Sequence, residues 1–349
     1  MQPAGAVAGP EGPSAPQLAL TQLREHLTDW MRHEPGARAG HDPEELHQLR
    51  VAVRRIEATL GVFKHQLPSR LANARKTAKG VLRALGTARD LDVQLMELRQ
   101  YCKQLSASER SAAAPLEARL KAERARAHSL MLGMLDSEAT RHWLEVLNLA
   151  SADLAAAAVP QEPRAATVMP ERVRARFRKL RKAVRKLDAR SPMEAYHLVR
   201  RRAKQLRYSI ECGAGLFGRP AETMLRALRR MQDSLGAQQD AHMAKIRLAA
   251  LAAEGTPLPP ETLFLMGRLA EHHLAGTREV RRTLSRAWGK VSGRRWKALR
   301  ARMQELSDAA SGELPADPET GVVAPGMPIV VPPEAELPTP PTEGAPLRH

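Results

Sequence analysis

Residues 197–211 read HLVRRRAKQLRYSIE and carry six cationic side chains in their first eleven positions, His197 included. At about 100° per residue of a helix, these residues separate into two stripes. The apolar stripe consists of Val199, Ala203, Leu206 and Ile210. The neighbouring stripe consists of His197, Arg200, Lys204, Arg207 and Tyr208. Such a helix is predicted to pack on one side and to present its cations to a groove beside the packed side.

The same pattern occurs 150 residues earlier in the chain. This single shift aligns His47 with His197, Arg50 with Arg200, Arg54 with Lys204, and LGTARD (85–90) with LGAQQD (235–240). One offset that holds over more than forty residues indicates an internal duplication of a helical unit. The Pro-bearing segment at 158–171 separates the copies, so repeat one is predicted at about 17–160 and repeat two at about 165–310.

The composition predicts an all-α fold, because good helix formers dominate and aromatic residues make up only 3%. The histidine helices are predicted to start at DPEE (42–45) and SPME (191–194), each with a capping box and a Pro at the first helical position. The other helices are predicted at 17–33, 69–104, 115–135, 138–157, 168–188, 219–251, 260–276 and 278–309.

The charge of the chain is unevenly distributed. The formal net charge is +17, whereas the Pro-rich segment 311–349 holds six carboxylates and one arginine, so the remainder carries +22. A body this basic repels itself unless it meets an anionic partner. Nucleic acid, an anionic membrane surface and inorganic polyphosphate are the candidate partners. Residues 1–16 and 311–349 are predicted to be disordered, because they cannot bury enough apolar surface.

The sequence also indicates where the protein resides. Two cysteines, Cys102 and Cys212, do not form a disulfide framework and fit a reducing cytoplasmic setting. The chain shows neither a signal-peptide pattern nor an apolar run long enough to cross a bilayer, so no membrane insertion is expected. The oligomeric state is left open.

Further cations accompany the histidine helices. They are Arg75, Lys76, Lys79 and Arg83 in repeat one, and Arg226, Arg229 and Arg230 in repeat two. Leu85-Gly86 and Leu235-Gly236 are predicted to be close helix-packing points, and Asp90 and Asp240 to have structural roles in capping or pairing. No metal site, cofactor site or catalytic residue is predicted, because no carboxylate cluster, Gly-rich phosphate loop or nucleophile–base pair accompanies the histidines.

Three stretches resemble the CHAD domain (conserved histidine α-helical domain): DPEELHQLRVAVRRIEATLGVF, LGTARDLDV and SPMEAYHLVRRRAKQLRYSIECGAGLFG. The resemblance extends over about 15–310. It implies two tandem four-helix-bundle-like repeats around a basic central groove or pore that binds polyphosphate, in some members on polyphosphate granules. The resulting candidate polyphosphate-binding residues are His47, Arg50, Arg54, Arg55, Lys76, Lys79, Arg83, His197, Arg200, Arg201, Lys204, Arg207, Arg226 and Arg229.

One position departs from the family's pattern. Glu57 stands where the family usually has another Arg, which should weaken the grip of the first repeat or pair Glu57 with a neighbouring arginine. The expected function is non-enzymatic binding of inorganic polyphosphate. The alternative is a sequence-nonspecific nucleic-acid-binding protein, although stacking aromatic residues are scarce. An enzyme acting on phosphoanhydrides is the third and least favoured reading.

Overall fold

The computed structural model describes residues 12–152, 163–188, 191–253, 257–275 and 280–311, without the side chains of 237–243, 274–275, 280–282 and 311. Within these ranges the secondary structure is helical, apart from an isolated β-bridge between Ser14 and Arg164. The prediction of an all-α fold is therefore confirmed. The predicted tail 311–349 lies almost wholly outside the described residues, as do residues 1–11 of the predicted disordered N-terminus.

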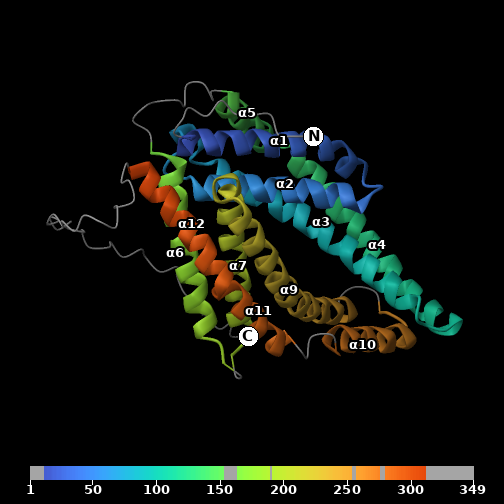
Figure 1. Ribbon diagram of the computed structural model, residues 1–349. Coiled ribbons are helices and arrows are strands. Elements are labelled where there is room, and N and C mark those ends of the chain that lie inside the picture. The colour runs from blue at the N-terminus through green and yellow to red at the C-terminus, as the bar shows by residue number, and fades with distance from the viewer. Residues whose placement is uncertain (1–11, 153–162, 189–190, 254–256, 276–279, 312–349) are drawn as a thin grey trace, which may run out of the picture. The chain divides into compact units, whose positions relative to one another are not determined.

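Both halves of the chain are built from helices (Figure 1). The first half contains α1 (Ala15–Ala39), α2 (Pro43–Val62), the short 3₁₀ helix η1 (Ser69–Leu71), α3 (Ala74–Cys102), α4 (Ala107–Leu135) and α5 (Glu138–Ala152). The second half contains α6 (Ala165–Arg185), α7 (Met193–Cys212), α8 (Ala214–Phe217), α9 (Arg219–Ala253), α10 (Pro260–Ala275), α11 (Val280–Ser292) and α12 (Arg294–Ser311). The motif helices α2 and α7 occupy equivalent places in the two halves.

The first helix starts earlier than its composition suggests. Ser14 and Gln17 form a reciprocal capping box, and Ala15 at the start of α1 is fully buried. Two backbone hydrogen bonds join the start of α1 to the second half. The N–H of Ala15 donates to the carbonyl oxygen of Pro163, and the N–H of Ala165 donates to the carbonyl oxygen of Pro13. Residues 14–16, predicted to be disordered with the rest of the N-terminus, are thus part of the folded body. These residues are ordered by tertiary contacts, which the composition of the segment does not reveal.

The predicted capping boxes of the two histidine helices are wrong. In α2 the side chain of Asp42 caps the backbone N–H of Glu44, while Glu45 contacts His33 instead of the N-cap. In α7 the N-cap residue is Pro192, and the hydroxyl of Ser191 bonds to Asp188. The helices begin close to the predicted positions, but nearby side chains compete for the groups that would complete each box.

One long predicted helix, 278–309, is divided into α11 and α12. The break falls at Gly293, where a Cβ atom would lie only 2.8 Å from the backbone oxygen of Gly289. Another residue at this position would clash with backbone, so the close turn requires glycine. The helix predicted at 115–135 starts at Ala107 instead, behind a capping box made by Ser106 and Glu109, and runs through Pro115.

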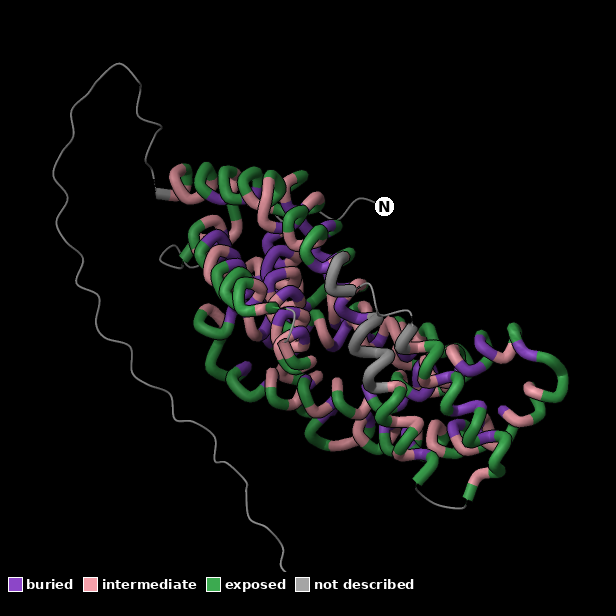
Figure 2. The backbone as a smooth tube through the Cα atoms, turned by 90° about the horizontal axis from the view of Figure 1, so that it is seen from below, coloured by how far each residue is buried: buried purple, intermediate pink, exposed green. Residues whose placement is uncertain are grey.

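Two hydrophobic cores hold the halves together, and each core takes helices from both. The first core contains Leu265, Met266 and Leu269 of α10 beside residues of α1–α5. The second core contains Ala15 and Ala19 of α1 beside residues of α6–α9, α11 and α12. The buried positions in Figure 2 recur along the helices as stripes facing their neighbours. Each of the two predicted repeats therefore contributes a helix segment to the core of the other.

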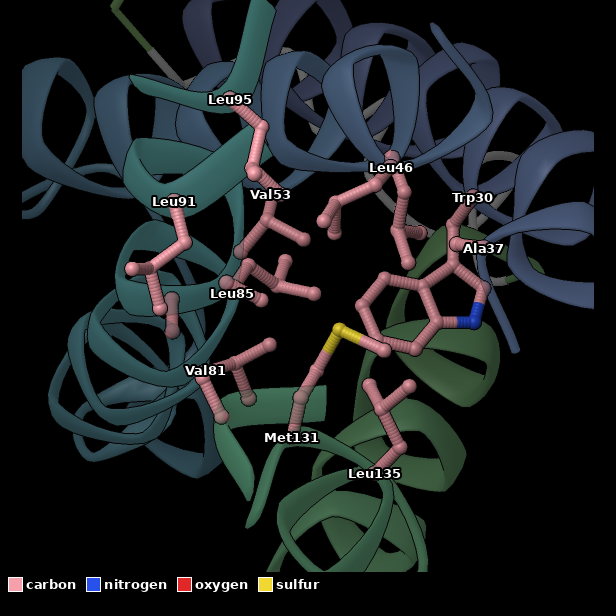
Figure 3. Close-up of a cluster of buried hydrophobic side chains, with 14 of the residues drawn as sticks. Trp30, Ala37, Leu46, Val53, Val81, Leu85, Leu91, Leu95, Met131 and Leu135 are labelled. Carbon is pink, nitrogen blue, oxygen red and sulfur yellow. The ribbon is translucent and has the colours of Figure 1, made fainter. Parts of the chain in front are cut away.

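Aromatic rings tie the first helix of each half to later helices. In the first half, the ring of Trp30 meets that of Trp143 edge-on at 5.6 Å, and Figure 3 shows it beside Met131 and Leu135 of α4. In the second half, Phe177 of α6 stacks on Trp296 of α12 at 3.6 Å between ring centroids. These rings supply large buried areas and fix the helices that support α2 and α7.

Candidate functional site

The two motif helices come from different halves of the chain and contact each other. Helix α2 packs directly against α7, and the hydroxyl of Thr59 lies 3.9 Å from the Sγ atom of Cys212 in the buried contact. The apolar stripes predicted from the sequence are buried, including Val53 and Ile56 on α2 and Leu206 on α7. The neighbouring cationic stripes are only half-buried and lie along the seam between the halves.

Lys204 lies at the centre of these cations. Its amine interacts electrostatically with Arg200 and Arg207 of its own helix and with Arg54 and Arg50 of α2. Burial, followed by repulsion from these four arginines, lowers the pKa of Lys204 from 10.5 to about 7. Among the described residues, no carboxylate lies within 4 Å of Lys204 or Arg54. Cations of both halves therefore share one partly desolvated site without full neutralisation.

Arg50 is held in place by α3. Its Nη1 donates to the backbone oxygen of Leu82 at 2.9 Å, and a Cβ on Gly86 would lie 3.2 Å from the same nitrogen. Gly86 therefore admits the guanidinium, which explains the glycine in LGTARD more specifically than helix packing does. Burial and then Arg54 lower the pKa of Arg50, and Asp90 offsets part of this effect. Asp90 thus interacts electrostatically with Arg50, whereas the side chain of Asp240 lies outside the described residues.

His47 lies at the edge of this group beside Arg89. Burial, and then the positive charge of Arg89, lower the pKa of His47 below 6.5. Arg89 itself donates to the backbone oxygen of Pro43 at 3.0 Å, which fixes it across the start of α2. Sequence reasoning missed Arg89, although the residue lies inside LGTARD, one turn after Gly86. We call the following residues the cationic seam: His47, Arg50, Arg54, Arg89, Arg200, Lys204 and Arg207.

Glu211 organises the arginines at the far end of α7. It lies 3.4 Å from Arg207 and 3.6 Å from Arg229. The guanidinium of Arg207 lies over the ring of Tyr208, 4.8 Å from its centroid. The Tyr208 hydroxyl is buried and has no hydrogen-bond partner among the described residues. Glu211 therefore holds one arginine of α7 and one of α9.

Glu57 pairs with a neighbouring arginine, one of the two outcomes that the sequence allowed. Its carboxylate accepts from Arg75 Nε at 2.8 Å, and it also attracts Arg176 of α6. Glu57 lines an open cavity of about 560 Å³ together with Lys76, Lys79, Leu82 and Arg83. Candidate cations of α3 thus share a cavity with a carboxylate.

Replacing Glu57 by Gln should strengthen anion binding. The change removes a negative charge from a cationic surface and releases Arg75, so a polyanion such as polyphosphate, the ligand that the sequence predicts, should bind about 2- to 5-fold more tightly at low salt. Glu117→Gln is the matched control, since Glu117 also pairs with two cations, Arg99 and Lys121, away from the motif helices. Weaker binding by Glu57→Gln in a titration would show that Glu57 instead holds Arg75 in a binding position.

Several candidate residues lie apart from the cationic seam. Arg55 pairs with Asp29 at 3.5 Å and, with Arg229, lines a cavity of about 310 Å³ between α1, α2 and α7. Arg201 is exposed on α7, and His197 is half-buried. Arg226 lines a different cavity beside α11.

Metal sites and membrane-spanning helices are both lacking among the described residues. No group of three or more His, Cys, Asp or Glu side chains there is arranged to hold a metal ion. In the same ranges, no helix combines the length and the hydropathy that crossing a membrane requires. Neither cysteine forms a disulfide, and burial raises the pKa of the Cys212 thiol to about 12.

The architecture and the seam define an internally duplicated helical protein with a cationic contact between equivalent helices. A family model described as the CHAD domain matches residues 21–249, well over half of the sequence. The chain belongs to the CHAD domain family, as the motif stretches predicted.

Solved structures show the same fold. A crystal structure of the CHAD domain from the plant Ricinus communis is 22% identical, with a TM-score of 0.64, and the match covers 86% of this chain and 95% of that one. PptA from Streptomyces chartreusis is 23% identical, with a TM-score of 0.59, and the match covers 79% of this chain and 99% of that one. No curated protein matches the sequence.

Proposed function

We propose that the protein binds inorganic polyphosphate, without chemical conversion, through the cationic seam. The observation that carries the proposal is the position of Lys204 among four arginines from both halves. Mutual repulsion and burial make this arrangement unfavourable in the absence of an anion. A polyanion supplies the missing negative charge, so its binding relieves the repulsion and keeps Lys204 protonated.

The kind of cation favours phosphate oxygens as the ligand. Arginine presents a planar fork of donors that can hold two phosphate oxygens at once. Arg50 and Arg89 are anchored to backbone oxygens of Leu82 and Pro43. Such anchoring lowers the entropy lost on binding. The resemblance to CHAD domains, which bind polyphosphate, points to the same ligand.

The surroundings of the seam favour polyphosphate over nucleic acid. Unpaired bases are usually held by stacking on exposed aromatic rings. Among the described residues of α2 and α7, the Phe, Tyr and Trp rings are limited to Tyr196, which is buried, and Tyr208, which is half-buried with Arg207 over its face. Polyphosphate has no bases and needs only cations. Polyphosphate binding would also bring the protein to polyphosphate granules, which we include in the proposal.

A competition assay tests the choice of polyanion. Fluorescent polyphosphate is bound to the protein, and unlabelled polyphosphate or double-stranded DNA is added at equal concentrations of negative charge. We expect unlabelled polyphosphate to displace the probe at a concentration at least about tenfold lower than DNA does. Equal displacement by DNA would favour nonspecific nucleic-acid binding. Release of orthophosphate in the presence of magnesium would show an enzyme instead.

A further inference from the structure

A second basic cavity lies in the second half, between α9, α11 and the start of α12. Its volume is about 340 Å³. Five cations line it: Arg226, Arg230, Arg286, Lys290 and Arg295. Three residues with hydroxyl groups complete the polar lining: Thr223, Ser234 and Thr283. None of these side chains belongs to the cationic seam, so the cavity is a separate feature of the molecule.

The cations of this cavity repel one another. Arg226 and Arg230 lie one turn apart on α9, and Arg286 and Lys290 lie one turn apart on α11. Like charges at this spacing weaken a helix. Arg226 has one distant partner, Glu222 at 3.9 Å. Within the described part of the chain, no carboxylate lies within 4 Å of Arg230, Arg286, Lys290 or Arg295. Each wall of the cavity therefore carries a pair of cations that lacks full neutralisation.

The duplication supplies an internal comparison. Under the 150-residue shift, Arg230 corresponds to Gly80 on α3. A Cβ on Gly80 would lie 3.1 Å from the terminal methyl group of Met134 on α4, so apolar packing fills that position in the first half. In the second half the corresponding position is an arginine that lines a cavity. The arginine at this position is therefore particular to the second half, whereas the neighbouring Arg226 corresponds to Lys76, which lines a cavity in the first half.

We infer that this cavity is a second anion site that holds one compact oligophosphate group. Four residues of a helix rise about 6 Å, so each cation pair extends over a length similar to that of a triphosphate. The volume falls near the lower end of small-molecule pockets, which span roughly 300–1,000 Å³. Inorganic triphosphate and the triphosphate of a nucleotide share this chemistry. The inference does not rest on the proposed function, because the two sites share no side chain.

Calorimetric titration of the full chain with inorganic triphosphate tests the inference. We expect Arg286→Glu/Lys290→Glu to weaken triphosphate binding roughly tenfold or more, because the charge of one wall is reversed. Arg286→Gln/Lys290→Gln should cause a smaller loss in the same direction and conserves helix-forming side chains. Arg178→Glu/Lys182→Glu on α6 is the matched control, with the same charge change at the same spacing on exposed residues.

The outcomes separate this site from the cationic seam. Triphosphate binding that is lost in the α11 variants, with long polyphosphate still bound at the seam, supports a second site. ATP is tested in parallel to identify the source of the phosphate group. If both ATP and inorganic triphosphate bind, the cavity recognises the triphosphate group that they share. If inorganic triphosphate alone binds, the ligand is a free oligophosphate. Wild-type triphosphate affinity in both α11 variants would overturn the inference. Loss only in Arg200→Glu/Lys204→Glu would overturn it too, while supporting the seam.

Discussion

Reversing two charges of the cationic seam, in the variant Arg200→Glu/Lys204→Glu, is expected to weaken binding of long polyphosphate by at least about 100-fold at roughly 0.1 M salt. The substitutions turn Lys204 and one of the four arginines around it into carboxylates. These carboxylates would attract Arg50 and Arg54 of α2 and so occupy the donors that the ligand needs. Both side chains are only half-buried, so the fold should survive.

The same α6 pair, Arg178→Glu/Lys182→Glu, separates a local effect from a change in net charge. This variant changes the net charge by the same amount, and its residues are exposed on a helix that contributes nothing to the cationic seam. Its polyphosphate affinity should stay within about 3-fold of wild type. Helical circular dichroism and the melting temperature check that both variants are folded. Equal losses in the two variants would mean that only overall charge matters.

Polyphosphate affinity should fall as the pH rises through 7. The pKa of Lys204 is about 7 in the free protein, and a bound polyanion raises it by favouring the protonated amine. Binding therefore takes up a proton at pH values above 7, and a more alkaline solution opposes it. Between pH 6 and pH 9 we expect the affinity to drop roughly 10- to 50-fold. His47, with its lowered pKa, should strengthen binding further at still lower pH.

Lys204→Arg distinguishes this mechanism from a general effect of pH. Arginine keeps its charge throughout this range, so the variant should bind with nearly constant affinity between pH 7 and pH 9. Long polyphosphate is the suitable ligand, because its internal phosphates stay ionised. Titrations at fixed ionic strength provide the measurement. A wild-type decline that persists unchanged in Lys204→Arg would exclude Lys204 as its source.

The sequence was sufficient for features that depend on register. The 150-residue shift and the angular separation of apolar and cationic positions predicted which helices are equivalent and which sides they bury. Leu206 and Val53 are buried as the pattern requires, while Arg54 and Lys204 meet across the contact. These features follow from helix geometry, which has a fixed period that can be followed along a single sequence.

The remaining features depend on contacts between distant segments. Arginines and lysines recur around the whole circumference of α6, so only the packed structure shows that Arg176 interacts with Glu57. Helical spacing assigned Arg226 to the polyphosphate site, yet α11 completes a separate cavity around it. Similarly, the start of α1 packs in the core of the second half, and α10 packs in the core of the first half. These placements follow from tertiary packing and produce no periodic pattern in the sequence.

The central claim is that the seam binds a base-free polyanion, and one direct measurement tests it. Polyphosphate of defined length and a DNA duplex of equal charge are titrated separately into the wild-type protein over a series of salt concentrations. Both affinities should decline with salt, because counterions are released on binding. The account predicts that polyphosphate binds more tightly than DNA at every salt concentration. DNA affinity equal to or greater than that of polyphosphate throughout the series would contradict it.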